Sequence, residues 1–121
     1  MAPARPLGKA RAARFDHLPP GVAASARVRT SRLLPRQADA MTVGRTILVR
    51  PGHEASEPLM AHELVHVRQW QDLGWLGFLR AYVGAYLRNV VRLRDHRAAY
   101  LAIPLEAEAR EEAARWAARH R

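Results

Sequence analysis

Residues 59–69 of the chain read Leu-Met-Ala-His-Glu-Leu-Val-His-Val-Arg-Gln and place His62 and His66 four residues apart. Side chains four apart in an α-helix lie on the same face, one turn above each other. Two imidazoles in this arrangement can bind one metal ion, and Glu63 can reach a water molecule on that ion. The alternative is a pair of ordinary histidines on an amphipathic helix. Because apolar neighbours predict that this helix packs in a core, where unpartnered polar groups are costly, we favour the metal site.

The composition limits what kind of metal site this can be. The 121 residues are enough for one domain, and the hydrophobic fraction of 49% supports a modest core. The chain has no cysteine, which excludes disulfides and every zinc site built on thiolates. Any metal ion would therefore need histidine and carboxylate ligands.

The positive charge is concentrated in the first half of the chain. The formal net charge is +9, and residues 1–53 carry nine Arg and one Lys against only Asp16 and Asp39. A basic segment can attract nucleic acid or an anionic membrane surface. However, the basic residues are not interleaved with aromatic ones, and we find no known nucleic-acid-binding motif. We therefore do not expect nucleic-acid binding as the main function.

The N-terminal residues differ in composition from the rest. Residues 1–24 hold four of the eight prolines and many Arg and Ala, and are expected to form a basic, poorly ordered arm. This arm is expected to dock through Phe15 and Leu18. The remaining residues, 25–121, are expected to form the domain itself.

Patterning within the domain predicts an α+β fold. Residues 26–34 alternate as a short strand would, and the β-branched run over 41–49 predicts a hairpin or a bent strand. Helices are expected from about 58 to 72, from about 75 to 93, and from Pro104 to about 119. The sequence thus predicts a short β-hairpin or small sheet packed on about three helices.

Residues 73–93 have about the length of a membrane span, but they contain Arg80, Arg88 and Arg92 on one helical stripe. This pattern indicates an amphipathic helix. The helix could simply pack in the core, or its broad apolar face could mediate self-association or dock on a protein or membrane surface. With neither a convincing span nor a secretory signal, a cytoplasmic location is expected, and export by a non-classical route stays open. Five aromatic residues at helical spacing are expected to serve packing: Trp70, Trp75, Phe78, Tyr82 and Tyr86.

A metal site with two histidines requires a third protein ligand. Five residues further along the chain could supply it: Asp95, His96, Glu106, Glu108 and Glu111. Glu106 and Glu108 are two apart on a predicted helix, so at most one of them should face the metal. Tyr100 is either a core aromatic residue or a hydroxyl donor to the oxyanion that forms during hydrolysis.

Two stretches resemble known families. Pro104-Leu105-Glu106-Ala107-Glu108-Ala109 resembles the third-ligand helix of gluzincin peptidases, in which the ligand Glu is followed three residues later by Ala and then Asp. Ala109 matches this pattern, whereas Arg110 stands where the Asp is usual. The resemblance implies that Glu106, rather than Glu108, is the third ligand.

Residues 39–69 are similar to a bacterial zincin-like domain of unknown function, often found in proteins linked to extracellular contractile injection systems. The similarity rests on a strand with Thr42-x-Gly44 before the helix that carries H-E-L-x-H-V-x-Q. It implies a minimal metallopeptidase domain.

Together, these observations predict a zinc-dependent metallopeptidase that cleaves a peptide or protein substrate. Zn²⁺ would be held by His62, His66 and Glu106, and Glu63 would act as the general base on a zinc-activated water. The strand at 46–50 is expected at the edge of the cleft, where an extended peptide could add to the sheet. Two alternatives stay open: a zinc-bound structural or interaction domain without catalysis, and a basic surface or nucleic-acid adaptor.

Overall fold

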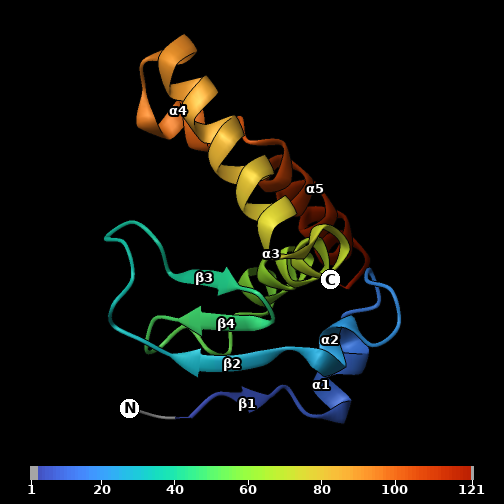
Figure 1. Ribbon diagram of the computed structural model, residues 1–121. Helices are drawn as coiled ribbons and strands as arrows, with labels where there is room; N and C mark the ends of the chain where they lie inside the picture. The colour runs from blue at the N-terminus through green and yellow to red at the C-terminus, as the bar shows by residue number, and fades with distance from the viewer. Residues whose placement is uncertain (1–2, 121) are drawn as a thin grey trace.

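The hairpin predicted over residues 41–49 belongs to a four-stranded sheet (Figure 1). The computed structural model describes residues 3–120. The strands lie in the order β1-β2-β4-β3. Their bounds are Arg5–Pro6 for β1, Arg27–Thr30 for β2, Ala40–Val43 for β3 and Thr46–Val49 for β4.

β4 is an interior strand, so the prediction that the strand at 46–50 forms the cleft edge is wrong. It pairs antiparallel with β3 on one side and parallel with β2 on the other. Its sequence, Thr-Ile-Leu-Val, is the most apolar of the four strands, and Ile47 and Val49 are fully buried. Such a strand is favoured where both of its hydrogen-bonding edges are paired. The edge on this side of the sheet is β3 instead.

Five helices are present in residues 3–120: α1 (Lys9–Arg14), α2 (Val22–Ser25), α3 (Glu57–Leu93), α4 (His96–Leu101) and α5 (Pro104–Arg119). The three predicted helices are confirmed, since α3 contains two of them and α5 is the third. The short helices α1, α2 and α4 were not predicted. The α+β class is confirmed, with more helices than expected.

A kink at Gly74 divides α3 into an inner half, residues 57–73, and an outer half, residues 75–93. Gly74 has φ 72° and ψ 171°, a backbone conformation that favours glycine. Ser56 caps the start of the inner half: its hydroxyl accepts a hydrogen bond from the backbone N–H of Leu59 at 3.4 Å. It contacts both β3 and β4, while α5 packs along α3.

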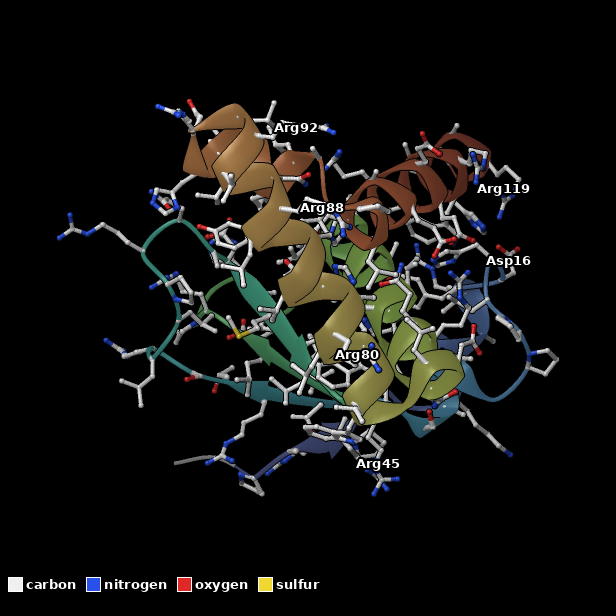
Figure 2. All side chains as sticks on the ribbon, turned by 45° about the horizontal axis from the view of Figure 1, so that its top comes forward. Asp16, Arg45, Arg80, Arg88, Arg92 and Arg119 are labelled. Carbon is white, nitrogen blue, oxygen red and sulfur yellow. The ribbon has the colours of Figure 1, made fainter. Side chains whose placement is uncertain are left out.

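The outer half of α3 is exposed over much of its surface. Figure 1 shows it leading away from the sheet toward α4. In Figure 2, Arg80, Arg88 and Arg92 follow one another along it, as the predicted stripe requires. No helix among residues 3–120 is long and apolar enough to cross a bilayer.

The beginning of the chain takes a definite place in the fold. Residues 3–24, expected as a poorly ordered arm, contain β1, α1 and most of α2. Phe15 is 3% exposed and stacks on Trp116 of α5 with ring centroids 5.0 Å apart, and Leu18 packs against the same core. Burial of these apolar side chains holds the segment in place. The division of the chain at residue 24 stays a prediction.

Candidate metal centre

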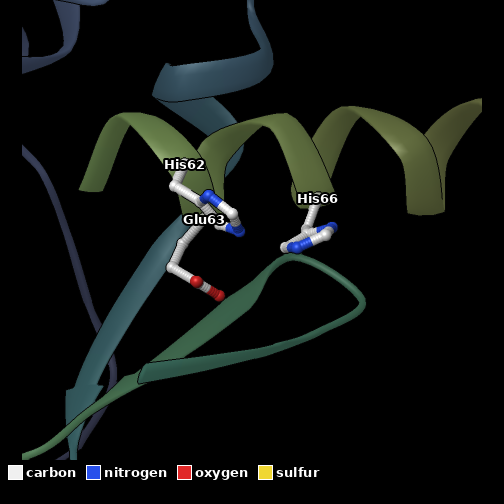
Figure 3. A group of neighbouring side chains, drawn as sticks. All are labelled: His62, Glu63 and His66. Carbon is white, nitrogen blue, oxygen red and sulfur yellow. The ribbon is translucent and has the colours of Figure 1, made fainter. Parts of the chain in front are cut away.

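The two histidines of the motif project from the inner half of α3 as the helical period requires. Figure 3 shows both rings leaving the same side of the helix, toward the β3–β4 hairpin. Their ring centroids are 5.0 Å apart. Ligand atoms of His62, Glu63 and His66 lie within 4.8 Å of one another, so this group could hold a metal ion.

α5 brings a second carboxylate to the same place. Glu106 is 4% exposed, and its Oε1 lies 3.1 Å from His62 Nε2 and 3.2 Å from His66 Nε2. Glu108, in contrast, is half exposed and forms an ion pair with Arg68. The two glutamates thus diverge around α5, and only Glu106 faces the histidines.

The other acidic and histidine candidates for the third ligand lie elsewhere. Asp95 caps α4 by accepting a hydrogen bond from the backbone N–H of Ala98 at 2.9 Å. The exposed His96 contacts the hydroxyl of Tyr86. Glu111 is exposed on α5.

The distances from Glu106 to His62 and to His66 are compatible with a shared metal ion. In a tetrahedral site with metal–ligand bonds of 2.0–2.2 Å, neighbouring ligand atoms are separated by roughly 3.3–3.5 Å. The separations of 3.1 and 3.2 Å between Glu106 Oε1 and the two imidazole nitrogens are close to this range. Imidazole and carboxylate are also the zinc ligands available to a chain without cysteine.

Glu63 is a buried carboxylate beside the histidines. It is 6% exposed, and its Oε1 accepts a hydrogen bond from the hydroxyl of Thr42 in β3 at 2.9 Å. Burial raises the pKa of Glu63, and this outweighs the opposing effects of His66, His62 and Thr42. The pKa of this carboxyl is therefore higher than that of an exposed glutamate.

The protonation states of Glu106 and His66 are coupled. Burial alone would raise the pKa of Glu106, but the hydrogen bonds from His62 and His66 hold it well below its usual range. Burial would lower the pKa of His66, but the adjacent Glu106 carboxylate raises it. In the absence of a metal ion, the Glu106 carboxylate thus favours the protonated form of His66, and the histidines favour the ionised form of Glu106.

Two tyrosines lie near Glu106. The hydroxyl of Tyr82, in the outer half of α3, donates to Glu106 Oε2 at 2.6 Å. The sequence predicted only packing for Tyr82, because nothing local links it to a carboxylate 24 residues away. Tyr100, on α4, is 43% exposed; partial burial and then the Glu106 carboxylate raise the pKa of its hydroxyl. Both hydroxyls are thus kept protonated as donors at neutral pH.

The comparison with known families bears on part of this site. Residues 22–74 match the eCIS core domain, a family named after extracellular contractile injection systems. The matched segment contains both histidines and Glu63 but ends before Glu106. No curated protein and no solved structure matches the chain. The match supports the link of residues 39–69 to extracellular contractile injection systems, whereas the place of Glu106 rests on the geometry.

We expect the purified protein to bind about one zinc ion per chain. Glu106→Ala should weaken binding sharply, because it removes the carboxylate that contacts both histidines. Glu108→Ala, two residues away, is the matched control and should change the affinity far less. Metal analysis and titration against a chelator would measure this. A larger loss in Glu108→Ala than in Glu106→Ala would contradict the assignment.

The raised pKa of His66 predicts a pH dependence of both metal binding and stability. In the metal-free protein, protonated His66 stabilises the fold fully below its unfolded pKa of about 6.5, and this contribution is lost as pH rises through the higher folded value. Zinc must displace the same proton, so its affinity should increase with pH until the pH exceeds the raised pKa of folded His66. Urea unfolding of chelator-treated protein and zinc titration at several pH values measure the two trends. In the metal-free His66→Gln variant, the free energy of unfolding should fall less as the pH rises than it does in the parent. If the variant and the parent have the same pH profile, His66 is not the cause of the pH dependence.

Proposed function

We propose that this chain is a zinc-dependent metallopeptidase domain. The observation that carries the proposal is the convergence of His62, His66 and Glu106 on one point beside the buried carboxylate of Glu63. In this proposal the first three residues hold the metal ion, and Glu63 is the general base. The ligand set is that of a gluzincin.

The side chains around the site suit the hydrolysis of an amide. Zinc, when bound, would polarise the substrate carbonyl and lower the pKa of water to about 7. Glu63 would accept a proton from the attacking water and pass it to the leaving amine, a role suited by its raised pKa. The hydrogen bond from Thr42 fixes the orientation of that carboxylate. Tyr100 is the proposed hydroxyl donor to the developing oxyanion, since its protonated hydroxyl borders the site.

The free edge of β3 supports an extended peptide as the substrate. Among residues 3–120, β3 pairs only with β4, and Thr42 at its centre contacts Glu63. A peptide that added to this edge as a further strand would run beside the catalytic carboxylate. Because the substrate would be bound through its backbone, the edge of β3 would discriminate little between peptides of different sequence.

A second proposal concerns the outer half of α3 as a docking surface. Leu76 and Val91 are 71% and 77% exposed, and they mark the ends of a stripe of exposed apolar residues completed by Leu79, Val83 and Leu87. A row of exposed apolar side chains of this kind is typical of a contact with a partner. The match to the eCIS core domain supports a role within a protein assembly related to injection systems.

Two alternative functions, a structural zinc domain and a nucleic-acid adaptor, would behave differently from a peptidase in experiments. A zinc-bound structural or interaction domain would keep the metal but cleave nothing, and its buried Glu63 would then serve no catalytic role. A basic adaptor for nucleic acid would bind DNA with an affinity that falls steeply with salt. The buried Glu63 beside the histidines favours the peptidase.

Glu63→Gln should separate catalysis from metal binding. The substitution removes the general base and no proposed ligand, so zinc content and fold should be retained while cleavage of unstructured peptides falls at least about 10²-fold. Glu111→Gln, on the exposed surface of α5, is the control and should cleave at the parental rate. Equal cleavage by Glu63→Gln and the parent would exclude Glu63 as the base. A parent protein that binds zinc but cleaves no peptide would favour the structural alternative.

The docking proposal is tested by Val91→Asp, which places a charge on the exposed stripe without disturbing the core. We expect the parent to self-associate in concentration-dependent light scattering, or to co-sediment with anionic vesicles, and the variant to lose this behaviour. Leu33→Asp is the matched control, because Leu33 is 83% exposed outside α3. A parent that stays monomeric and ignores vesicles would exclude both self-association and membrane docking.

A further inference from the structure

Gln69 lies three residues after His66 on α3 and is 2% exposed. It makes three polar contacts. Its Oε1 lies 2.8 Å from His66 Nδ1, and its Nε2 donates to the carbonyl of Leu105 at 3.0 Å and to Glu108 Oε1 at 2.8 Å. A buried amide with all of these contacts has one fixed orientation.

The partners of Gln69 determine which end of the amide faces His66. The Leu105 carbonyl and the Glu108 carboxylate can only accept hydrogen bonds at neutral pH, so the NH₂ group must face them. The amide oxygen is then the atom that faces His66, and an oxygen there requires a proton on Nδ1. This leaves Nε2, the atom near Glu106, as the nitrogen whose lone pair can bind a metal.

The contact distances support the same assignment. His66 Nδ1 is 2.8 Å from Gln69, whereas His66 Nε2 is 3.2 Å from Glu106 Oε1. That oxygen is also approached by His62 at 3.1 Å. The shorter and unshared hydrogen bond is the one to Gln69.

Gln69 also connects the two helices that supply the ligands. Leu105, whose carbonyl it contacts, immediately precedes Glu106, and Glu108 is held in turn by Arg68 beside Gln69. The side chain of Gln69 thus contacts His66 on α3 and also the backbone beside Glu106 on α5.

We propose that Gln69 is a positioning residue of this site: its amide oxygen holds the proton on His66 Nδ1 and thereby reserves Nε2 for the metal. The expected effect of Gln69 on zinc affinity rests on the proposed metal site. Outer contacts of this kind typically change metal affinity 10–100-fold.

Three variants separate this role from helix packing. Gln69→Leu removes both the acceptor for His66 and the donors to α5. Gln69→Glu keeps an acceptor at Nδ1 but loses the donors. Gln71→Leu makes the same substitution two residues away, at an exposed position whose side chain donates a hydrogen bond to Ser25 on α2.

Two measurements on the whole chain test the proposal. Competition with a fluorescent chelator gives the zinc affinity, and NMR of ¹⁵N-histidine-labelled, metal-free protein gives the solvent-exchange rate of the His66 Nδ1–H proton. We expect Gln69→Leu to bind zinc 10–100-fold more weakly and to exchange this proton faster. Gln69→Glu should have nearly the zinc affinity and the proton-exchange rate of the parent, although its melting temperature should be lower. Gln71→Leu should match the parent in both measurements.

The outcomes distinguish this inference from the proposed function. If the parent binds no zinc, the metal site is refuted, and the exchange rate alone decides whether Gln69 holds the His66 proton. Unchanged affinity and exchange in Gln69→Leu would overturn the inference. Equal losses in Gln69→Leu and Gln69→Glu would overturn it too, because the contact with α5, rather than the acceptor, would then be responsible.

Discussion

The contact between α5 and the inner half of α3 is the interaction on which the site depends. It brings Glu106 to within 3.2 Å of two imidazoles that lie 40 and 44 residues earlier in the chain. The same contact carries the ion pairs of Arg68 with Glu108 and Glu112, beside the amide of Gln69. Charged and polar groups thus fix the helices against each other where an apolar interface alone would permit sliding.

Burial of charge is the second constraint. Glu63 and Glu106 are both removed from water, which is costly unless each carboxylate has partners. Thr42 donates to one of them, and Tyr82 and the two histidines surround the other. A divalent cation between these groups would offset the excess negative charge, so desolvation and metal binding favour the same arrangement.

The kink at Gly74 allows a single helix to contribute twice to this arrangement. The inner half supplies the histidines, and the outer half turns back so that Tyr82 reaches Glu106. Trp75, just after the kink, lies over the turn of the hairpin: a Cβ on Gly44 would come within 2.7 Å of its indole ring. The positive φ of 65° at Gly44 favours glycine as well. Gly44 therefore permits the close approach of the hairpin to Trp75, and Gly74 permits the kink that precedes Trp75.

The sequence by itself determined the features that follow from local periodicity. The spacing of His62 and His66 placed both rings on one helical face, and Pro104 marked the start of α5. The two-residue spacing of Glu106 and Glu108 meant that at most one of them should face the metal. The tertiary structure alone decided the contacts between distant residues: the pairing of β4 with β2, the edge position of β3, the stacking of Phe15 on Trp116, and the hydrogen bond from Tyr82. Local patterns set which way a side chain points on its own element, because backbone geometry repeats within a few residues. Which element lies opposite depends on how the whole chain buries its apolar surface, and no single stretch of sequence contains that information.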